Sequence, residues 1–322
     1  MKNNYIIRPR EDSDLASFIS LRSKVFGDDE GFIEFFDDCF RDDYLDFLII
    51  EEQGDGAVLQ AALTQFDMGR LVIPTGKKSE IAGKSIEMSY AICTDPAARG
   101  KGYGSHITVY AREIAESSRK LSMLSPAEPS LIKFYEPLEY KKFMYAEQGS
   151  IHVSEQDNFE FLQLQFKIIT PQEYNNYREK ILANRVHIKL SDGALRFVAG
   201  LVEADTSGSA PAMDDGSGLM LISDGAEPLA IAACETAGQG SLAVSELLTF
   251  SEDGGHKELG LAIAKALAAR CGAQRCDYMM PSRAGSESSA PLGMISASYE
   301  ELAEVYSPEH GECPPYMGFA FG

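Results

Sequence analysis

The most informative part of this sequence is the segment Ile92-Cys93-Thr94-Asp95-Pro96-Ala97-Ala98-Arg99-Gly100-Lys101-Gly102-Tyr103-Gly104-Ser105. The residues before it, from Lys84 to Thr94, have the composition of a β-strand, and those after it, to about Ser118, repeat apolar side chains at helical spacing. We therefore predict a glycine-rich turn that joins a strand to a helix. Successive backbone N–H groups in such a turn, together with the positive end of the helix, can bind a pyrophosphate.

Arg99 and Lys101 place two positive charges in this turn, although the chain has 29 basic and 49 acidic residues and a formal net charge of −20. Gly102 and Gly104 allow the backbone to approach a ligand closely. A purely structural turn can also contain glycine, but alternation of glycines with bases favours a phosphate site. The Walker sequence G-x4-G-K-[ST] is absent, and the dinucleotide sequence G-x-G-x-x-G fails at Ser105.

The pattern that is present, Arg-x-x-Gly-x-Gly over Arg99 to Gly104, resembles the acetyl-coenzyme A pyrophosphate loop of the GNAT superfamily of N-acetyltransferases. The predicted order of elements from Tyr5 to about Phe166 is also similar to that fold. Further on, the segment from Phe134 to Tyr140 resembles the family's aromatic-Tyr-x-x-Leu-Gly-Phe sequence, with Glu139 in place of the usual glycine. The asparagine that often precedes this segment is Glu128 here.

The resemblance implies a role for each residue of the loop and of the strand before it. The backbone of Ile92 to Thr94 would pair with pantetheine like an added strand, and Tyr135 matches the position of the family's general acid. The expected coenzyme-binding residues are Ile92, Cys93, Thr94, Arg99, Gly100, Lys101, Gly102, Tyr103, Gly104 and Ser105. Cys93 is expected to be a small strand residue and not a nucleophile, because no histidine partner is evident. No set of metal ligands is expected.

The general base is less well defined by the sequence. Some family members use a glutamate on the strand before the loop, which makes Glu87 the candidate. An exposed strand residue accounts for Glu87 equally well, since a shift of one residue changes the face of the sheet. A water chain to bulk solvent, or the C-terminal carboxylate of Gly322 as in some tandem relatives, are the alternatives.

The second half of the sequence repeats the predicted element order of the first half. We expect an α/β (α+β) fold of two tandem GNAT-like domains, each a mixed, mostly antiparallel sheet flanked by helices. The expected limits are 1–167 for the coenzyme-binding domain, closed by strands at 143–153 and 159–166, and 168–322 for a degenerate copy. In the second turn, Glu252 and Asp253 stand where Arg99 and Lys101 stand in the first. Two carboxylates would repel a pyrophosphate, so this half is expected to be scaffold, substrate wall or oligomer surface.

The resemblance extends to tandem acetyltransferases such as the enhanced intracellular survival proteins, although this chain is too short for their sterol-carrier-like domain. It implies an N-acetyltransferase that moves an acetyl group from acetyl-CoA, the co-substrate, to a primary amine by direct attack. A non-catalytic acyl-CoA-binding or sensor module is the first alternative. A dinucleotide-binding enzyme is the second, and the residue at Ser105 disfavours it.

Charge and composition limit the partners and the location. The net charge of −20 argues against nucleic acid and against anionic membranes. No stretch approaches the about 18 apolar residues of a membrane helix, and the first residues have no signal-peptide pattern, so we expect a cytoplasmic protein. Asp28 to Asp46 holds nine acids against one base, Arg41. This run could attract a cationic small-molecule or peptide amine, but a solvated helix face is the simpler interpretation.

Overall fold

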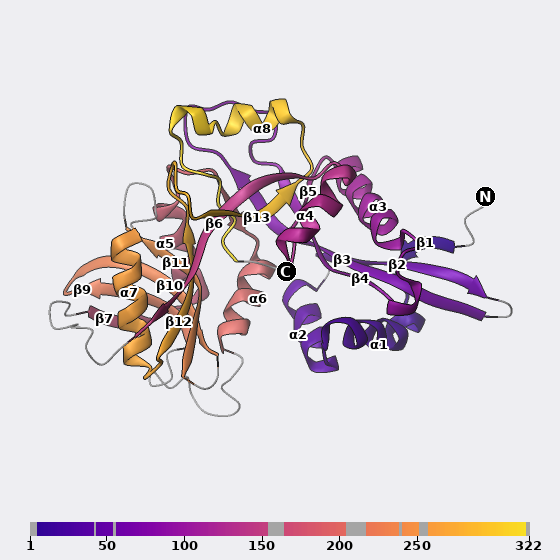
Figure 1. Cartoon of the computed structure of the whole chain (residues 1–322), viewed down its shortest axis with the longest axis horizontal. Helices are drawn as coiled ribbons and strands as arrows, with labels where there is room; N and C mark the ends of the chain where they lie inside the picture. The colour runs from indigo at the N-terminus through magenta and orange to yellow at the C-terminus, as the bar shows by residue number, and fades with distance from the viewer. Residues whose placement is uncertain are drawn as a thin grey trace.

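The structure, a computed structural model, describes residues 5–41, 43–53, 56–153, 164–203, 217–237, 240–250 and 257–319. Figure 1 shows two groups of helices and strands joined by long strands at the centre. Within the described residues, none of the helices has the length and apolar character needed to cross a membrane. The turn predicted at 251–256, with Glu252 and Asp253, and the C-terminal Gly322 lie outside the described residues.

The first half has the predicted order of elements, with ends that shift by a few residues. Its elements are β1 (Tyr5–Pro9), α1 (Leu15–Phe26), α2 (Glu30–Phe40), β2 (Tyr44–Gln53), β3 (Gly56–Val72), β4 (Ser85–Thr94), α3 (Tyr103–Ser117), β5 (Leu121–Leu124), α4 (Ile132–Tyr135) and β6 (Lys141–His152). The expected mixed α/β class is confirmed.

The second half repeats this order and adds elements that the sequence did not indicate. It contains β7 (Leu164–Ile168), α5 (Pro171–Ile181), β8 (His187–Leu190), α6 (Asp192–Glu203), β9 (Gly218–Asp224), β10 (Glu227–Thr236), β11 (Ser241–Thr249), α7 (Lys257–Arg270), β12 (Arg275–Pro281), β13 (Ser289–Ile295) and α8 (Tyr299–Val305). The additions are β8, β13 and α8. In each half one strand pair is parallel and connected by a helix: β4 and β5 by α3, and β11 and β12 by α7.

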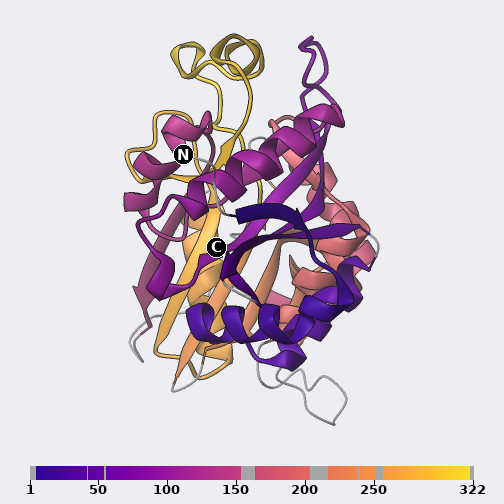
Figure 2. The same ribbon diagram turned by 90° about the vertical axis from the view of Figure 1, so that its right-hand side faces the viewer.

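The alternation of apolar side chains explains how helices cover both faces of the first sheet. Phe47 and Ile49 of β2 pack with residues of α3, whereas the intervening Leu48 and Ile50 pack with residues of α1 and α2. Figure 2 shows α3 and α1 on opposite sides of these strands. This two-sided burial is the reason that β2 reads as a nearly continuous apolar run.

The two halves share one sheet because they exchange their last strands. β6 pairs with β12 of the second half, and β13 pairs with β5 of the first half and also with β6. Of the strand expected at 159–166 to close the first unit, residues 159–163 lie outside the described residues, and the described residues 164–166 form a strand that does not close that unit. The strand there, β7, pairs with β9 and takes the edge position that β1 takes beside β2. The domain limits at 167 and 168 stay a prediction.

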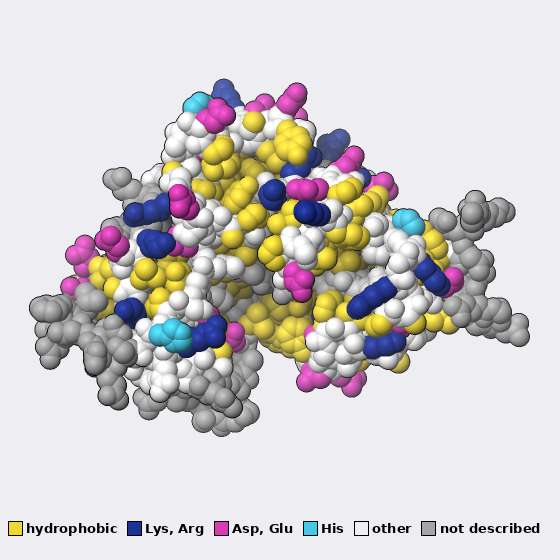
Figure 3. Space-filling model, in the orientation of Figure 1, with side chains coloured by type: hydrophobic (Ala, Val, Ile, Leu, Met, Phe, Trp, Pro, Cys, Tyr) yellow, Lys and Arg dark blue, Asp and Glu magenta, His cyan; other side chains and the backbone are white. Residues whose placement is uncertain are grey.

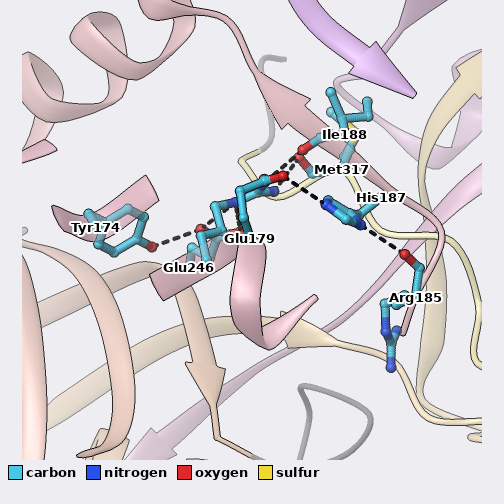
Figure 4. Close-up of polar contacts among 8 residues, drawn as sticks. Tyr174, Glu179, Arg185, His187, Ile188, Glu246 and Met317 are labelled. Carbon is cyan, nitrogen blue, oxygen red and sulfur yellow. Dashed lines mark hydrogen bonds and ion pairs between the residues drawn. The ribbon is translucent and has the colours of Figure 1, made fainter. Parts of the chain in front are cut away.

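A buried polar cluster fixes the C-terminal segment against the second half (Figure 4). The fully buried Glu246 carboxylate of β11 accepts hydrogen bonds from the Tyr174 hydroxyl at 2.7 Å and from Nε of the buried Arg178 at 3.1 Å. Arg178 also donates to the backbone oxygens of Ile188 at 2.7 Å and Met317 at 3.1 Å. This arrangement satisfies the charge of Arg178 and holds the chain close to Phe319, which lines a cavity with residues of both halves.

Candidate functional site

Near its C-terminal end, β4 carries a bulge in its pairing with β3. The register against β3 shifts between Cys93 and Tyr90, and Ala91 between them has a positive φ of 49°. On the other side, β5 pairs with β4 only from Ile86 to Ser89. The β4 backbone from Tyr90 to Thr94 therefore has no β5 partner in the sheet, so its polar groups on that side can bind an extended ligand.

The glycine-rich turn contains two glycines with positive φ. Gly100 and Gly102 both have a φ of 83°, and Gly102 is the residue before the first turn of α3. A Cβ atom on Gly104 would lie 3.6 Å from Phe134 and 3.7 Å from Thr94 Oγ1, so the helix start packs closely against α4 and β4. The expected strand-turn-helix arrangement is confirmed.

The two bases of the turn differ in their contacts. Lys101 Nζ lies 3.3 Å from the Glu51 carboxylate in an ion pair whose lysine is 49% exposed, a kind of pair that contributes little to stability. Arg99 is exposed and has no ion pair among those of the described residues. Arg99 is thus the base of this turn that is most available to an anion.

Tyr135 lies beside the bulge, in a cavity that Ala91 also lines, and its role as general acid stays a prediction. It lines a cavity of about 360 Å³ together with Tyr90, Ala91, Ile92 and Asp28. Burial raises the pKa of Tyr135 to about 12. Its phenol therefore keeps its proton throughout the neutral range and can donate it into the cavity.

A carboxylate that the sequence analysis did not single out shares this cavity. Asp28 Oδ2 lies 2.8 Å from Nε and 2.6 Å from Nη2 of Arg22, which is 1% exposed. The guanidinium lies 5.5 Å from the ring centroid of Tyr90, which also lines the cavity. Asp28 is therefore held at the cavity wall. The acidic run of the sequence contained this residue but gave no sign of which member faces the site.

Other acidic residues between Asp28 and Asp46 form hydrogen bonds that stabilise the fold. Asp46 is buried and accepts hydrogen bonds from Arg10 Nε at 2.7 Å and from the Thr64 hydroxyl at 2.5 Å. Asp29 caps α2 by accepting a hydrogen bond from the backbone N–H of Phe32. A solvated helix face therefore describes only part of the run.

The structure does not bring Glu87 to Tyr135. The Glu87 carboxylate contacts Lys120 Nζ in a short ion pair, and it lines a separate cavity of about 200 Å³ that Tyr135 and Asp28 do not line. Desolvation raises the pKa of Glu87, and the bond to Lys120 acts in the opposite direction. The role of Glu87 as general base stays a prediction without support from this geometry.

Two predicted coenzyme-binding residues have side chains that point into the core. Cys93 is 3% exposed among residues of α1 and β2, and burial raises the pKa of its thiol to about 12, so it is not activated as a nucleophile. Tyr103 is 4% exposed and packs with Ile107 and Phe47. Only their backbone atoms can face a ligand. The remaining predicted positions, Ile92, Thr94 and Ser105, are partly exposed.

A larger cavity lies between the two halves. It has a volume of about 670 Å³, and Tyr90 lines it as well as the cavity at Tyr135. Phe32 of α2, Phe197 and Leu201 of α6, and Phe319 give it an apolar wall. Figure 3 shows hydrophobic side chains in the hollow between the halves. Such a cavity is large enough for a small organic ligand.

Comparisons by sequence give no relatives. No model of a known protein family matches the chain. No curated protein matches it either.

Solved structures do match, at low identity. A probable N-acyltransferase of unknown function from Enterococcus faecalis V583 has a TM-score of 0.62 at 12% identity, over 91% of this chain and 72% of that one. A GCN5-related N-acetyltransferase from Anabaena variabilis has a TM-score of 0.60 at 15% identity, over 90% and 72%. Eis1 from Mycobacterium abscessus has a TM-score of 0.52 at 10% identity, over 85% and 65%. The chain thus has the GCN5-related N-acetyltransferase fold, built as two halves in tandem.

Proposed function

We propose that the protein transfers an acetyl group from acetyl-coenzyme A to a primary amine. The observation that carries this proposal is the juxtaposition of the positive-φ glycine turn, the unpaired β4 backbone after the bulge, and the cavity lined by Tyr135. Acetyl-coenzyme A would supply the acetyl thioester. The backbone N–H groups of the turn and the Arg99 guanidinium would hold its pyrophosphate, and the β4 backbone from Tyr90 to Thr94 would hold its pantetheine.

Residues around the cavity would take part in the proton transfers that accompany direct attack of the amine on the acetyl thioester. The amine nitrogen forms a bond to the acetyl carbon, the carbon–sulfur bond breaks, and the departing sulfur takes up a proton. Water would first take the extra proton of the acceptor's ammonium group. Tyr135 would then donate a hydrogen bond or its proton to the departing sulfur, and the proton that the amine nitrogen loses would return to Tyr135 through water. A backbone N–H near the β4 bulge would donate a hydrogen bond to the acetyl oxygen.

Before the reaction, Asp28 would bind the ammonium form of the acceptor at the wall of the cavity. Asp28→Asn should raise the acceptor KM by about 10- to 100-fold while coenzyme A affinity stays within twofold, because a charged hydrogen bond of about 1.5–3 kcal/mol is lost. Steady-state kinetics and calorimetry measure the two quantities. Asp38→Asn, an exposed change on α2 outside the cavity, is the matched control.

Loss of the Arg22 ion pair could also lower stability, so the melting temperature of each variant is measured. Asp28→Glu keeps the charge and should retain part of the acceptor affinity. An unchanged acceptor KM in a folded Asp28→Asn variant would remove Asp28 from acceptor binding.

The body of the acceptor would extend into the central cavity, since Tyr90 lines both spaces. The proposal is tested by release of free thiol from acetyl-CoA with a panel of primary amines, with and without apolar groups. Amine-dependent thiol release supports acetyl transfer. Tight coenzyme binding without thiol release for any amine would favour the acyl-CoA sensor instead.

A further inference from the structure

A third cavity lies away from the proposed reaction site. It has a volume of about 400 Å³ and lies where the end of α3 and the start of β5 meet the segment between β13 and α8. Five bases line it, namely Lys84, Arg112, Arg119, Lys120 and Lys141. Three acids line it as well, namely Glu116, Glu139 and Glu301. Figure 3 shows blue and magenta side chains side by side below α8. The lining is net positive in a chain whose net charge is −20.

Two of these bases have no carboxylate partner within 4.0 Å in the part of the chain that the structure describes, namely Arg119 and Lys141. Lys141 Nζ instead donates to the backbone oxygen of Ala297 at 2.6 Å. Lys120 differs, because it is bound to Glu87 outside the lining. Arg119 and Lys141 are therefore cations that can serve an anionic ligand without breaking an ion pair.

Arg112 lies at the base of the cavity and is only partly satisfied. It is 9% exposed, and its Nε is buried without a hydrogen-bond partner among the described residues. Its guanidinium is paired through Nη1 with Glu139, whose side chain is 69% exposed, and its Nε lies 3.9 Å from Glu116. Exposed carboxylates contribute little binding free energy to such an ion pair. The buried Arg112 guanidinium can therefore exchange them for an anionic ligand with a small loss of free energy.

Glu139 itself stands at the position where the family sequence has glycine. It has a φ of 70°, a conformation that costs a residue with a side chain of order 1 kcal/mol or more. The ion pair with Arg112 is the contact that can offset the cost of this conformation. We infer that the Glu139 carboxylate takes the place on the Arg112 guanidinium that a bound anion would take, and that the anion would displace it.

We propose that this cavity binds a phosphate monoester, with Arg112, Arg119 and Lys141 around the phosphate group. The planar guanidinium of arginine matches a phosphate with two parallel hydrogen bonds. A volume of about 400 Å³ leaves room for a small body such as a sugar beyond the phosphate. The site is distinct from the glycine turn, because it lies at the C-terminal end of α3 and the turn lies at its N-terminal end.

Calorimetry on the full chain without coenzyme tests the proposal, with glucose 6-phosphate, inorganic phosphate and glucose as probes. Glucose 6-phosphate should bind with a stoichiometry of one, and glucose should not bind. Arg119→Glu should weaken binding by about tenfold or more, since a charge-assisted hydrogen bond becomes a repulsion. Glu139→Gln should tighten binding by about threefold or more, because Arg112 loses its competing carboxylate while Gln stays neutral.

Lys78→Glu and Glu113→Gln are matched controls, because both residues are exposed and neither lines the cavity. They should leave the affinity within twofold. Equal binding of inorganic phosphate would identify the phosphate group as the whole determinant and would support the site. The proposal is overturned if the sugar phosphate does not bind, if glucose binds equally, or if Glu139→Gln fails to tighten binding. Because no step of the assay involves acetyl transfer, the result does not depend on the proposed activity.

Discussion

Tyr135→Phe is expected to lower kcat for acetyl transfer by about 10²-fold, with coenzyme A affinity and melting temperature almost unchanged. The change removes only the hydroxyl and keeps the ring, which packs with Leu124, Tyr140 and Met294. Burial raises the pKa of Tyr135 to about 12, well above the about 8.5 of an ordinary thiol. Full proton transfer to the departing sulfur is therefore uphill, which places the loss at the lower end of the range for general acid catalysis.

The same pKa predicts how the rate depends on pH. The phenol stays protonated until the pH approaches about 12, so Tyr135 should cause no loss of rate between pH 7 and 10. Tyr145→Phe, a partly buried tyrosine of β6 outside this cavity, is the matched control. Full activity of folded Tyr135→Phe with a validated acceptor would leave solvent as the source of the proton.

Glu246→Gln should lower the free energy of unfolding by about 3–5 kcal/mol, the cost of leaving a buried charge without its partner. Arg178 is 0% exposed and would keep its charge next to a neutral amide. The Cα of Gly318, with a φ of 89°, lies so close that an added Cβ would be 2.7 Å from both Arg178 Nη2 and Glu246 Oε1. The backbone of Gly318 therefore packs directly against both groups, and the one other carboxylate near Arg178 among the described residues is that of Glu179, 3.7 Å from its Nη1.

Urea denaturation measures this difference, and Glu258→Gln on the exposed side of α7 is the control, with an expected change within about 0.5 kcal/mol. The double variant Arg178→Met with Glu246→Leu should recover much of the loss, since no buried charge remains. A change below about 1 kcal/mol for Glu246→Gln would show that Arg178 finds another partner and that this pair does not fix the C-terminal segment.

Helices and strands could be predicted where the pattern that indicates them lies within their own sequence. Apolar spacing and the glycine turn placed α3. The exchange of β6 and β13 between the halves could not be predicted. The sequence of each strand indicates partial burial, but it does not indicate which strand lies beside it. β8 is only four residues long and pairs with β3, which lies more than one hundred residues earlier, so its own sequence carries no sign of its partner.

The candidate site was predictable in its coenzyme loop and less so in its reaction cavity. The loop is a continuous segment whose glycines and bases are visible together. Asp28 reaches the cavity only because the buried Arg22 holds it, and neither the ion pair nor the bulge at Ala91 has a signature in the sequence. For Glu87, reasoning along one strand could not show that Lys120 from a different segment pairs with its carboxylate, and its role as general base stays a prediction.

Calorimetric titration of coenzyme A into the wild-type chain and into Arg99→Glu tests whether the turn between β4 and α3 binds the coenzyme. We expect one coenzyme per chain, because the second half carries Glu252 and Asp253 in the corresponding turn. Arg99→Glu should weaken binding by about 10- to 100-fold, since an anion then faces the pyrophosphate, and Lys78→Glu should have no such effect. Unchanged affinity in Arg99→Glu, or two coenzymes per chain, would contradict the assignment of a single site to the turn between β4 and α3.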